Sequence, residues 1–163
     1  MFQEAIAQYL KQNHYESIQL KSVLFDMDGV LFDSMPYHAE AWHKTMKAHG
    51  LNLSREEAYM HEGRTGAGTI NIVCQRQLGR DATQEEIESI YLEKSIEFNK
   101  HPQAERMPGA WELLQKIKAE GITPTVVTGS GQASLLDRLE HNFPGMFRQE
   151  LMVTAFDVKY GKP

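Results

Sequence analysis

One segment near the N-terminus, KSVLFDMDGVLFDS at Lys21–Ser34, constrains the fold of this chain more than any other. It begins with an apolar run, Val23–Phe25, that is typical of a strand in a parallel sheet. Asp26, Asp28 and Gly29 follow, at the strand end where open α/β sheets bind ligands. Two adjacent carboxylates repel each other unless a cation binds them, which indicates Mg²⁺, and Gly29 permits a sharp turn whose N–H groups face an anion. A solvated acidic turn is the alternative for so short a pattern.

Composition and charge exclude several classes of partner. The net charge of −5 argues against nucleic acid, because its binding depends on patches of Lys and Arg. No apolar run approaches the ~20 residues of a membrane span, and the N-terminal MFQEAIAQYLKQN lacks the apolar stretch of a signal peptide. We therefore expect neither a nucleic-acid nor a membrane partner. The single cysteine, Cys74, has no internal disulfide partner, which favours a reducing, cytoplasmic location.

Hydrophobic periodicity predicts an α/β fold interrupted by helices. Residues 2–12 predict a short amphipathic helix that packs on the surface, and residues 20–26 predict the first strand. Residues 36–101 contain no apolar strand and predict four helices. A helix, a strand, a helix and a final strand, LMVTAF at 151–156, follow Pro108. This order predicts a doubly wound, Rossmann-like core with an inserted helical cap.

The helix starts and the change of periodicity set the predicted domain boundaries. Ser54 with Glu57 and Thr83 with Glu86 have the spacing of capping boxes, so each pair predicts the start of a helix. We expect an N-terminal helical extension at 1–19, a core at 20–34 and 104–163, and a cap at 35–103.

Two further clusters lie where later strands end. Thr128, Gly129 and Ser130 follow the apolar Val126-Val127 pair, and N–H groups at such a turn suit an anion. The alternative is a plain turn with a serine cap. Lys159 and Lys162 follow the last predicted strand, and one lysine there could neutralise a phosphate or remain a solvated loop charge.

In this order, DMDGVLFDS, VVTGSG and YGKP resemble the motifs of the haloacid dehalogenase (HAD) superfamily, in the β-phosphoglucomutase branch with a helical cap. The resemblance covers residues 20–163. It implies that Asp26 is a nucleophile forming an aspartyl-phosphate and that Asp28 is the general acid/base. It also implies that Thr128 hydrogen-bonds the transferring phosphoryl group and that Lys162, between Gly and Pro, is the superfamily lysine. We expect the neighbouring carboxylate and the exclusion of water to raise the pKa of Asp28.

The cap carries the substrate preference that this resemblance implies. His38 corresponds to a residue that links cap closure to the acid/base, or is an ordinary helix histidine. Glu62, Gly63 and Arg64 resemble the specificity loop, although the mutase has a lysine where this chain has Glu62. We expect Glu62 to bind Mg²⁺ from the cap side and so to favour a small substrate, the alternative being a solvated loop acid. Lys94 contacts a distal phosphate or is a surface lysine.

Several longer strings, including AYMHEGRTGA and ERMPGAWELLQK, are similar to bacterial HAD-family inorganic pyrophosphatases. The leading prediction is therefore a Mg²⁺-dependent pyrophosphatase. The alternatives are a β-phosphoglucomutase-type phosphosugar mutase or sugar-phosphate phosphatase, and an inactive HAD-like fragment or binding module. The superfamily's fourth motif, which completes the metal site, is not found before Pro163. We expect the core to be C-terminally incomplete, with a separate C-terminal fragment as one partner that could complete it.

Overall fold

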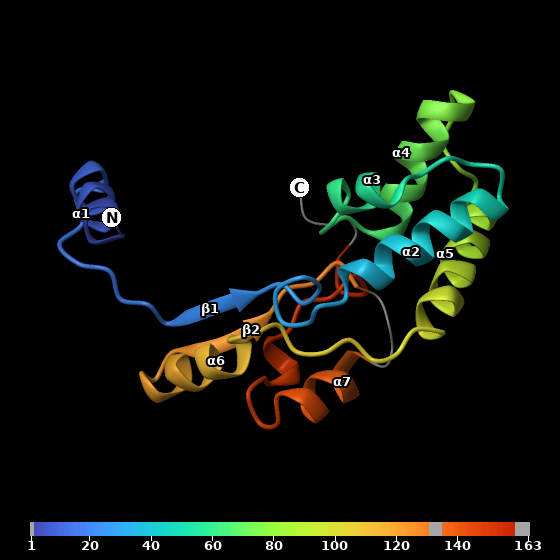
Figure 1. Ribbon diagram of the computed structural model, residues 1–163. Coiled ribbons are helices and arrows are strands. Elements are labelled where there is room, and N and C mark those ends of the chain that lie inside the picture. Colours follow the sequence, from blue (N-terminus) through green and yellow to red (C-terminus); the bar gives the residue numbers. More distant parts are fainter. Residues whose placement is uncertain (1, 131–134, 159–163) are drawn as a thin grey trace.

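The computed structural model describes residues 2–130 and 135–158 and shows an α/β core, a helical cap and an N-terminal helix (Figure 1). The cap emerges directly after the first strand, and the chain then returns to the core, as the sequence predicts. The elements are α1 (Phe2–Asn13), β1 (Ser22–Phe25), α2 (Met35–Ala48), α3 (Arg55–Met60), α4 (Gly66–Leu78), α5 (Gln84–Asn99), α6 (Ala110–Ala119), β2 (Thr123–Val126), α7 (Leu135–Asn142) and a 3-10 turn, η1 (Gln149–Leu151).

The described sheet consists of two parallel strands. β1 pairs with β2 in a register that places Phe25 opposite Val126, so both strands end at the same edge. Phe25 and Val126 are buried, whereas Leu24 points to the other face and is 65% exposed. Helices therefore cover one face of this sheet, whereas Leu24 on the other face is exposed.

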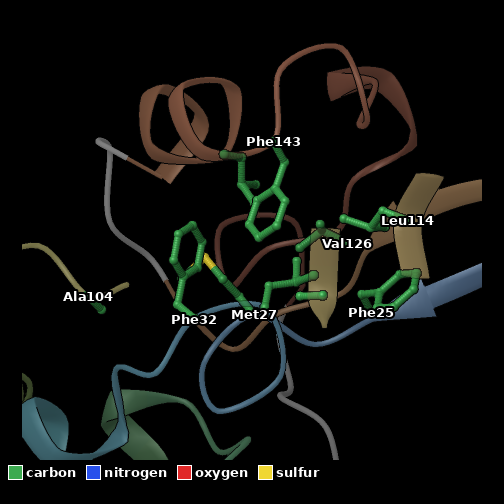
Figure 2. Packing of buried hydrophobic residues seen from close by; sticks show 10 residues of the cluster. Phe25, Met27, Phe32, Ala104, Leu114, Val126 and Phe143 are labelled. Carbon is green, nitrogen blue, oxygen red and sulfur yellow. The ribbon is translucent and has the colours of Figure 1, made fainter. Parts of the chain in front are cut away.

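A cluster of apolar side chains fixes α6 and α7 against the sheet (Figure 2). Leu114 of α6 and Val126 of β2 are fully buried, and so is Phe143, which follows α7. The rings of Phe143 and Phe32 meet edge to face at a centroid distance of 5.4 Å. Because Phe32 belongs to the loop after β1, this packing anchors the loop that carries Asp26 and Asp28.

The cap has an apolar core of its own, centred on Met46, Ile70 and Val73. The predicted helix starts are confirmed: the Ser54 hydroxyl accepts from the N–H of Glu57, and Thr83 forms a complete capping box with Glu86. Separate cores allow the cap and the sheet to move as two units about the segments that join them.

Two expectations are wrong. LMVTAF at 151–156 does not form a strand, because only Val153 bridges to Val127 while Gln149–Leu151 forms a 3-10 turn. Helix α1 does not pack on the surface: it stands apart from the other described helices and strands, with Ile6 and Tyr9 about half exposed (Figure 1). Of the helices in the described ranges, none has both the length and the apolar character needed to cross a membrane.

Candidate active site

The loop after β1 is a tight turn that holds its two carboxylates at the sheet edge. The Asp26 carboxylate accepts from the N–H of Met27 at 2.9 Å, and the N–H groups of Leu31 and Phe32 both donate to the Met27 carbonyl. Gly29 has a φ of +76°, and a Cβ at this position would lie 3.1 Å from Cγ of Met35. Glycine is therefore required both by the backbone conformation and by the close approach of α2.

Asp28 is buried and is held by side chains of α2 and its N-cap. The Ser34 hydroxyl donates to Oδ1 of Asp28 at 2.6 Å and makes no capping bond to its own helix. Nε2 of His38 lies 3.1 Å from the same oxygen, but the approach is too oblique for a strict hydrogen bond. We therefore treat the contact between His38 and Asp28 as electrostatic. The first turn of a cap helix thus fixes a core carboxylate.

Lys94 of α5 extends this arrangement across the cap. Its Nζ lies 2.8 Å from Nδ1 of His38, and the residue is 4% exposed. The ammonium also lies over the rings of Trp42 and Phe98, at 5.3 and 5.1 Å. The alternative that Lys94 is a surface lysine is wrong. An ammonium that donates to Nδ1 fixes the neutral imidazole tautomer with its proton on Nε2, facing Asp28.

Burial and charge shift the pKa of all three groups. Burial raises the pKa of Asp28, but the contacts from His38 and Ser34 outweigh it and lower the pKa overall. The expected rise in the pKa of Asp28 is therefore wrong for this arrangement, because the contacts with His38, Ser34 and the charge of Arg138 favour the carboxylate over the protonated form. Burial and the Lys94 charge lower the pKa of His38, and burial lowers the pKa of Lys94 to about 8.

The loop after β2 meets the cap directly. Thr128 is buried, its N–H donates to the Val153 carbonyl, and its hydroxyl accepts from the N–H of Ser130 at 3.1 Å. A Cβ on Gly129 would lie 3.0 Å from the carbonyl oxygen of Gly63 and 3.1 Å from that of Arg64. The predicted specificity loop of the cap therefore rests on the backbone of the predicted anion loop of the core.

A cavity of about 50 Å³ lies between these loops. It brings together most of the site residues that the sequence predicts, from both the core and the cap. These are Asp28, His38, Glu62, Gly63, Arg64, Lys94, Thr128, Gly129 and Ser130. Asp26 and Gly29 are described but do not line this cavity, whereas Lys159 and Lys162 lie outside the described residues.

Sequence reasoning missed three residues near the site. Ser34 is the last residue of the first motif and directly precedes α2, and this position could have indicated its contact with Asp28. Phe98 stacks on the His38 ring at 4.1 Å, and the charge of Arg138 acts on Asp28. No sequence pattern indicated these two, because their roles depend on how the cap meets the core.

The donor set is compatible with Mg²⁺ only in part. Within the described residues, no group of three or more His, Cys, Asp or Glu side chains could hold a metal ion. Glu62 is thus not brought into one cluster with Asp26 and Asp28. Mg²⁺ nevertheless binds in many proteins through one or two carboxylates together with waters and substrate phosphates. Asp26 and Asp28 are two carboxylates that could serve as such a pair of oxygen ligands.

Comparison with known proteins identifies the family. The family described as "Hydrolase: haloacid dehalogenase-like hydrolase" matches residues 20–163. The chain belongs to the haloacid dehalogenase-like hydrolases. Within this family, hexitol phosphatase A of Escherichia coli is 32% identical over 146 residues, which cover 90% of this chain and 64% of that protein. The phosphorylated carbohydrates phosphatase of Thermotoga maritima is 26% identical over 145 residues, which cover 88% of this chain and 65% of that protein.

A solved HAD-type structure is similar over almost the whole chain. This protein comes from Bacteroides vulgatus, and its assignment as a β-phosphoglucomutase is itself inferred. It is 72% identical in sequence and has a TM-score of 0.94. The match covers 99% of this chain and 65% of that chain. The chain therefore spans about two thirds of the length of these relatives. Their names favour the phosphosugar alternatives over the leading prediction of a pyrophosphatase.

Proposed function

We propose that this chain carries the nucleophile and the acid/base of a phosphatase that acts on phosphorylated sugars or sugar alcohols. The observation that carries the proposal is the placement of Asp28, which contacts His38 of the cap and lines a cavity shared with Thr128, while Lys94 of the cap binds the other side of His38. A carboxylate fixed in this way can exchange a proton with a leaving group only while the cap is docked. The names of the sugar-phosphate relatives support the class of substrate.

Asp26 would perform the first chemical step. Its carboxylate oxygen attacks phosphorus, a bond forms between Asp26 and the phosphoryl group, and the bond from phosphorus to the sugar oxygen breaks. Asp28 donates a proton to that departing oxygen. The step splits one difficult displacement into two easier ones.

Asp28 would then reverse its role. As a base it takes a proton from water, the water oxygen attacks phosphorus, and phosphate leaves with the Asp26 carboxylate restored. The Thr128 hydroxyl and the N–H of Gly129 hold the oxygens of the transferring group, and the N–H of Ser130 orients that hydroxyl by donating to it. Mg²⁺ bound to Asp26 and Asp28 would supply positive charge to these oxygens. Since the pKa of Asp28 is lowered in the described arrangement, substrate binding must raise it before it can donate.

Pyrophosphate is a second candidate substrate, and two features of the cap favour it. The cavity of about 50 Å³ has room for only a few waters at ~10–15 Å³ each, which suits a very small substrate while the cap is docked. Glu62 lines the cavity in place of the lysine of the mutase pattern, and its charge acts on Lys94. An acid at this position opposes the dianion of a sugar bisphosphate and suits a substrate that arrives with a cation.

Steady-state kinetics of the full-length protein test both candidates. The panel contains a hexitol phosphate, a hexose phosphate, a hexose bisphosphate and pyrophosphate, each with Mg²⁺. The main proposal expects kcat/KM for the sugar monophosphates to exceed that for pyrophosphate by at least ~tenfold, or ~1.4 kcal/mol of transition-state stabilisation. The reverse order supports the pyrophosphatase. Interconversion of phosphosugars without release of phosphate would instead indicate a mutase.

A further inference from the structure

Arg138 of α7 lies between the core and the cap. Its guanidinium carbon is 4.8 Å from the centre of the Phe32 ring and 5.9 Å from that of the Phe98 ring. Phe32 follows β1 and belongs to the core, whereas Phe98 lies in the last turn of α5, the final cap helix. One cation therefore contacts an aromatic face on each of the two domains.

The surroundings of this guanidinium are unusual for an arginine that is half buried. Within residues 2–130 and 135–158, no hydrogen bond or ion pair of its N–H groups is found. Burial lowers its pKa, and Asp28 is the charged group that acts on it. Aromatic faces attract a partly desolvated cation, so the two rings account for its position.

Arg138 also faces the segment that joins the cap to the core. It lines a cavity of about 200 Å³ together with Phe98, Asn99, His101 and the chain up to Ala104. This segment must change conformation if the cap moves away from the core, because it is one of the two connections between them. Arg138 thus lies against the segment that joins the cap to the core and against Phe32 of the core itself.

Phe98 connects this contact to the active site. The face of Phe98 stacks on the His38 ring with a centroid distance of 4.1 Å and an interplanar angle of 22°. Nε2 of the same His38 ring lies 3.1 Å from Oδ1 of Asp28. A displacement of Phe98 would therefore displace the imidazole that fixes the carboxylate.

We propose that Arg138 is a positioning residue that holds the cap in its docked arrangement by binding Phe98 and the 99–104 segment against Phe32, and that it thereby keeps His38 in place against Asp28. Only the consequence for turnover rests on the proposed function. The docking itself can be measured without a substrate.

Hydrogen exchange tests the docking directly. The reporters are the N–H groups of Lys100 and His101, which donate to Glu97 and Phe98 at the end of α5. Arg138→Met keeps an unbranched side chain but removes the charge and the planar guanidinium group. We expect hydrogen exchange at both reporters to become ~tenfold faster, or ~1.4 kcal/mol. The N–H of Val127, which donates to the Phe25 carbonyl where the two strands end, is the internal reference and should not change.

Arg106 provides a matched control. Its guanidinium also stacks on two aromatic rings, Trp111 at 5.0 Å and Phe143 at 5.5 Å, but both belong to the core. Arg106→Met should leave exchange at the reporters unchanged, although it lies near the same segment of chain. Arg138→Lys keeps the charge without the planar group and should give an intermediate rate.

The double variant Arg138→Met with Phe98→Leu isolates the contact. If Arg138 acts through Phe98, the second substitution adds little to the exchange rate of the first. Unchanged exchange in Arg138→Met, or full additivity in the double variant, would overturn the inference.

Kinetics separate this inference from the proposed function. We expect kcat of Arg138→Met to fall by ~tenfold with a smaller change in KM, and Arg138→Lys to recover part of the loss. If exchange quickens but the wild-type protein hydrolyses no phosphorylated sugar, the proposed function fails and the inference stands. If kcat falls while exchange is unchanged, the inference fails and the proposed function stands.

Discussion

Replacing Lys94 by methionine should make the protein more stable and less active. Lys94 is 4% exposed, and burial lowers its pKa from 10.5 to about 8. Each pKa unit corresponds to ~1.36 kcal/mol, so keeping the ammonium protonated in this site at neutral pH costs roughly 3 kcal/mol. Methionine has a similar length and flexibility and carries no charge, so Lys94→Met removes this cost.

Part of that gain is offset by the contacts that are lost. The ammonium lies 2.8 Å from His38 and over the rings of Trp42 and Phe98. We therefore expect the free energy of unfolding to rise by about 1–3 kcal/mol, while kcat falls at least ~tenfold because His38 loses the donor that fixes its tautomer. A gain in stability with a loss of activity is the expected result when a buried charge is kept for function.

Urea unfolding as a function of pH gives the sign of this effect. The folded-state pKa of Lys94 lies below its unfolded value, so between about pH 8 and 10.5 the unfolded chain binds more protons than the folded one. The free energy of unfolding of the wild type should therefore increase as the pH rises through this window. The difference in stability between the wild type and Lys94→Met should become smaller.

Lys44→Met is the matched control for this prediction. Lys44 lies on the cap surface, its side chain is 51% exposed, and it pairs with Glu40 at 3.2 Å. Its replacement should change stability by no more than ~0.5 kcal/mol and leave kcat unchanged. A Lys94→Met protein that is less stable than wild type, with the same gap at every pH, would refute the reasoning and make Lys94 a structural support.

Substitutions at three further positions test other parts of the site. Asp26→Asn should reduce activity below a tenth of wild type, a loss above ~1.4 kcal/mol, without changing the unfolding curve; retention of more than a tenth would exclude covalent catalysis there. Glu62→Lys should lower kcat/KM for pyrophosphate by more than ~tenfold while activity on a hexose phosphate holds or rises. Selectivity that is unchanged from the wild type in both Glu62→Lys and Glu62→Ala would leave this acid without a role. Gly129→Ala places a Cβ 3.0 Å from the Gly63 carbonyl oxygen and should raise KM by ~tenfold for every substrate, as measured by steady-state kinetics; an unchanged KM would show that the cap does not dock on Gly129.

The sequence predicted those parts of the structure that depend on neighbours along the chain. The capping box at Thr83 and Glu86 needs only four residues, and it is formed as expected. The strand that ends before Asp26 follows from a local apolar run, and the turn at Gly29 follows from a local backbone requirement. Such features need no knowledge of tertiary contacts.

Features that depend on tertiary contacts were harder to predict. The apolar run at 151–156 has the composition of a strand, but only Val153 reaches a partner, and the ladder does not continue in the described residues. The burial of Lys94 depends on α2 and α5 packing side by side, which brings residues 56 positions apart within hydrogen-bond distance. Arg138 and Phe98 meet only where the two domains dock, so no local pattern could have indicated them.

The central claim is that Asp26 becomes covalently phosphorylated, and trapping that intermediate tests it most directly. Asp28→Asn should slow the attack of water and let the intermediate accumulate when the full-length protein is mixed with a phosphorylated substrate. Reduction of the quenched protein with borohydride converts an aspartyl-phosphate into homoserine, which peptide mass spectrometry can locate. The account predicts homoserine at position 26 and at no other aspartate. Modification at a different residue, or turnover by the wild type with no modification at position 26 in either protein, would contradict it.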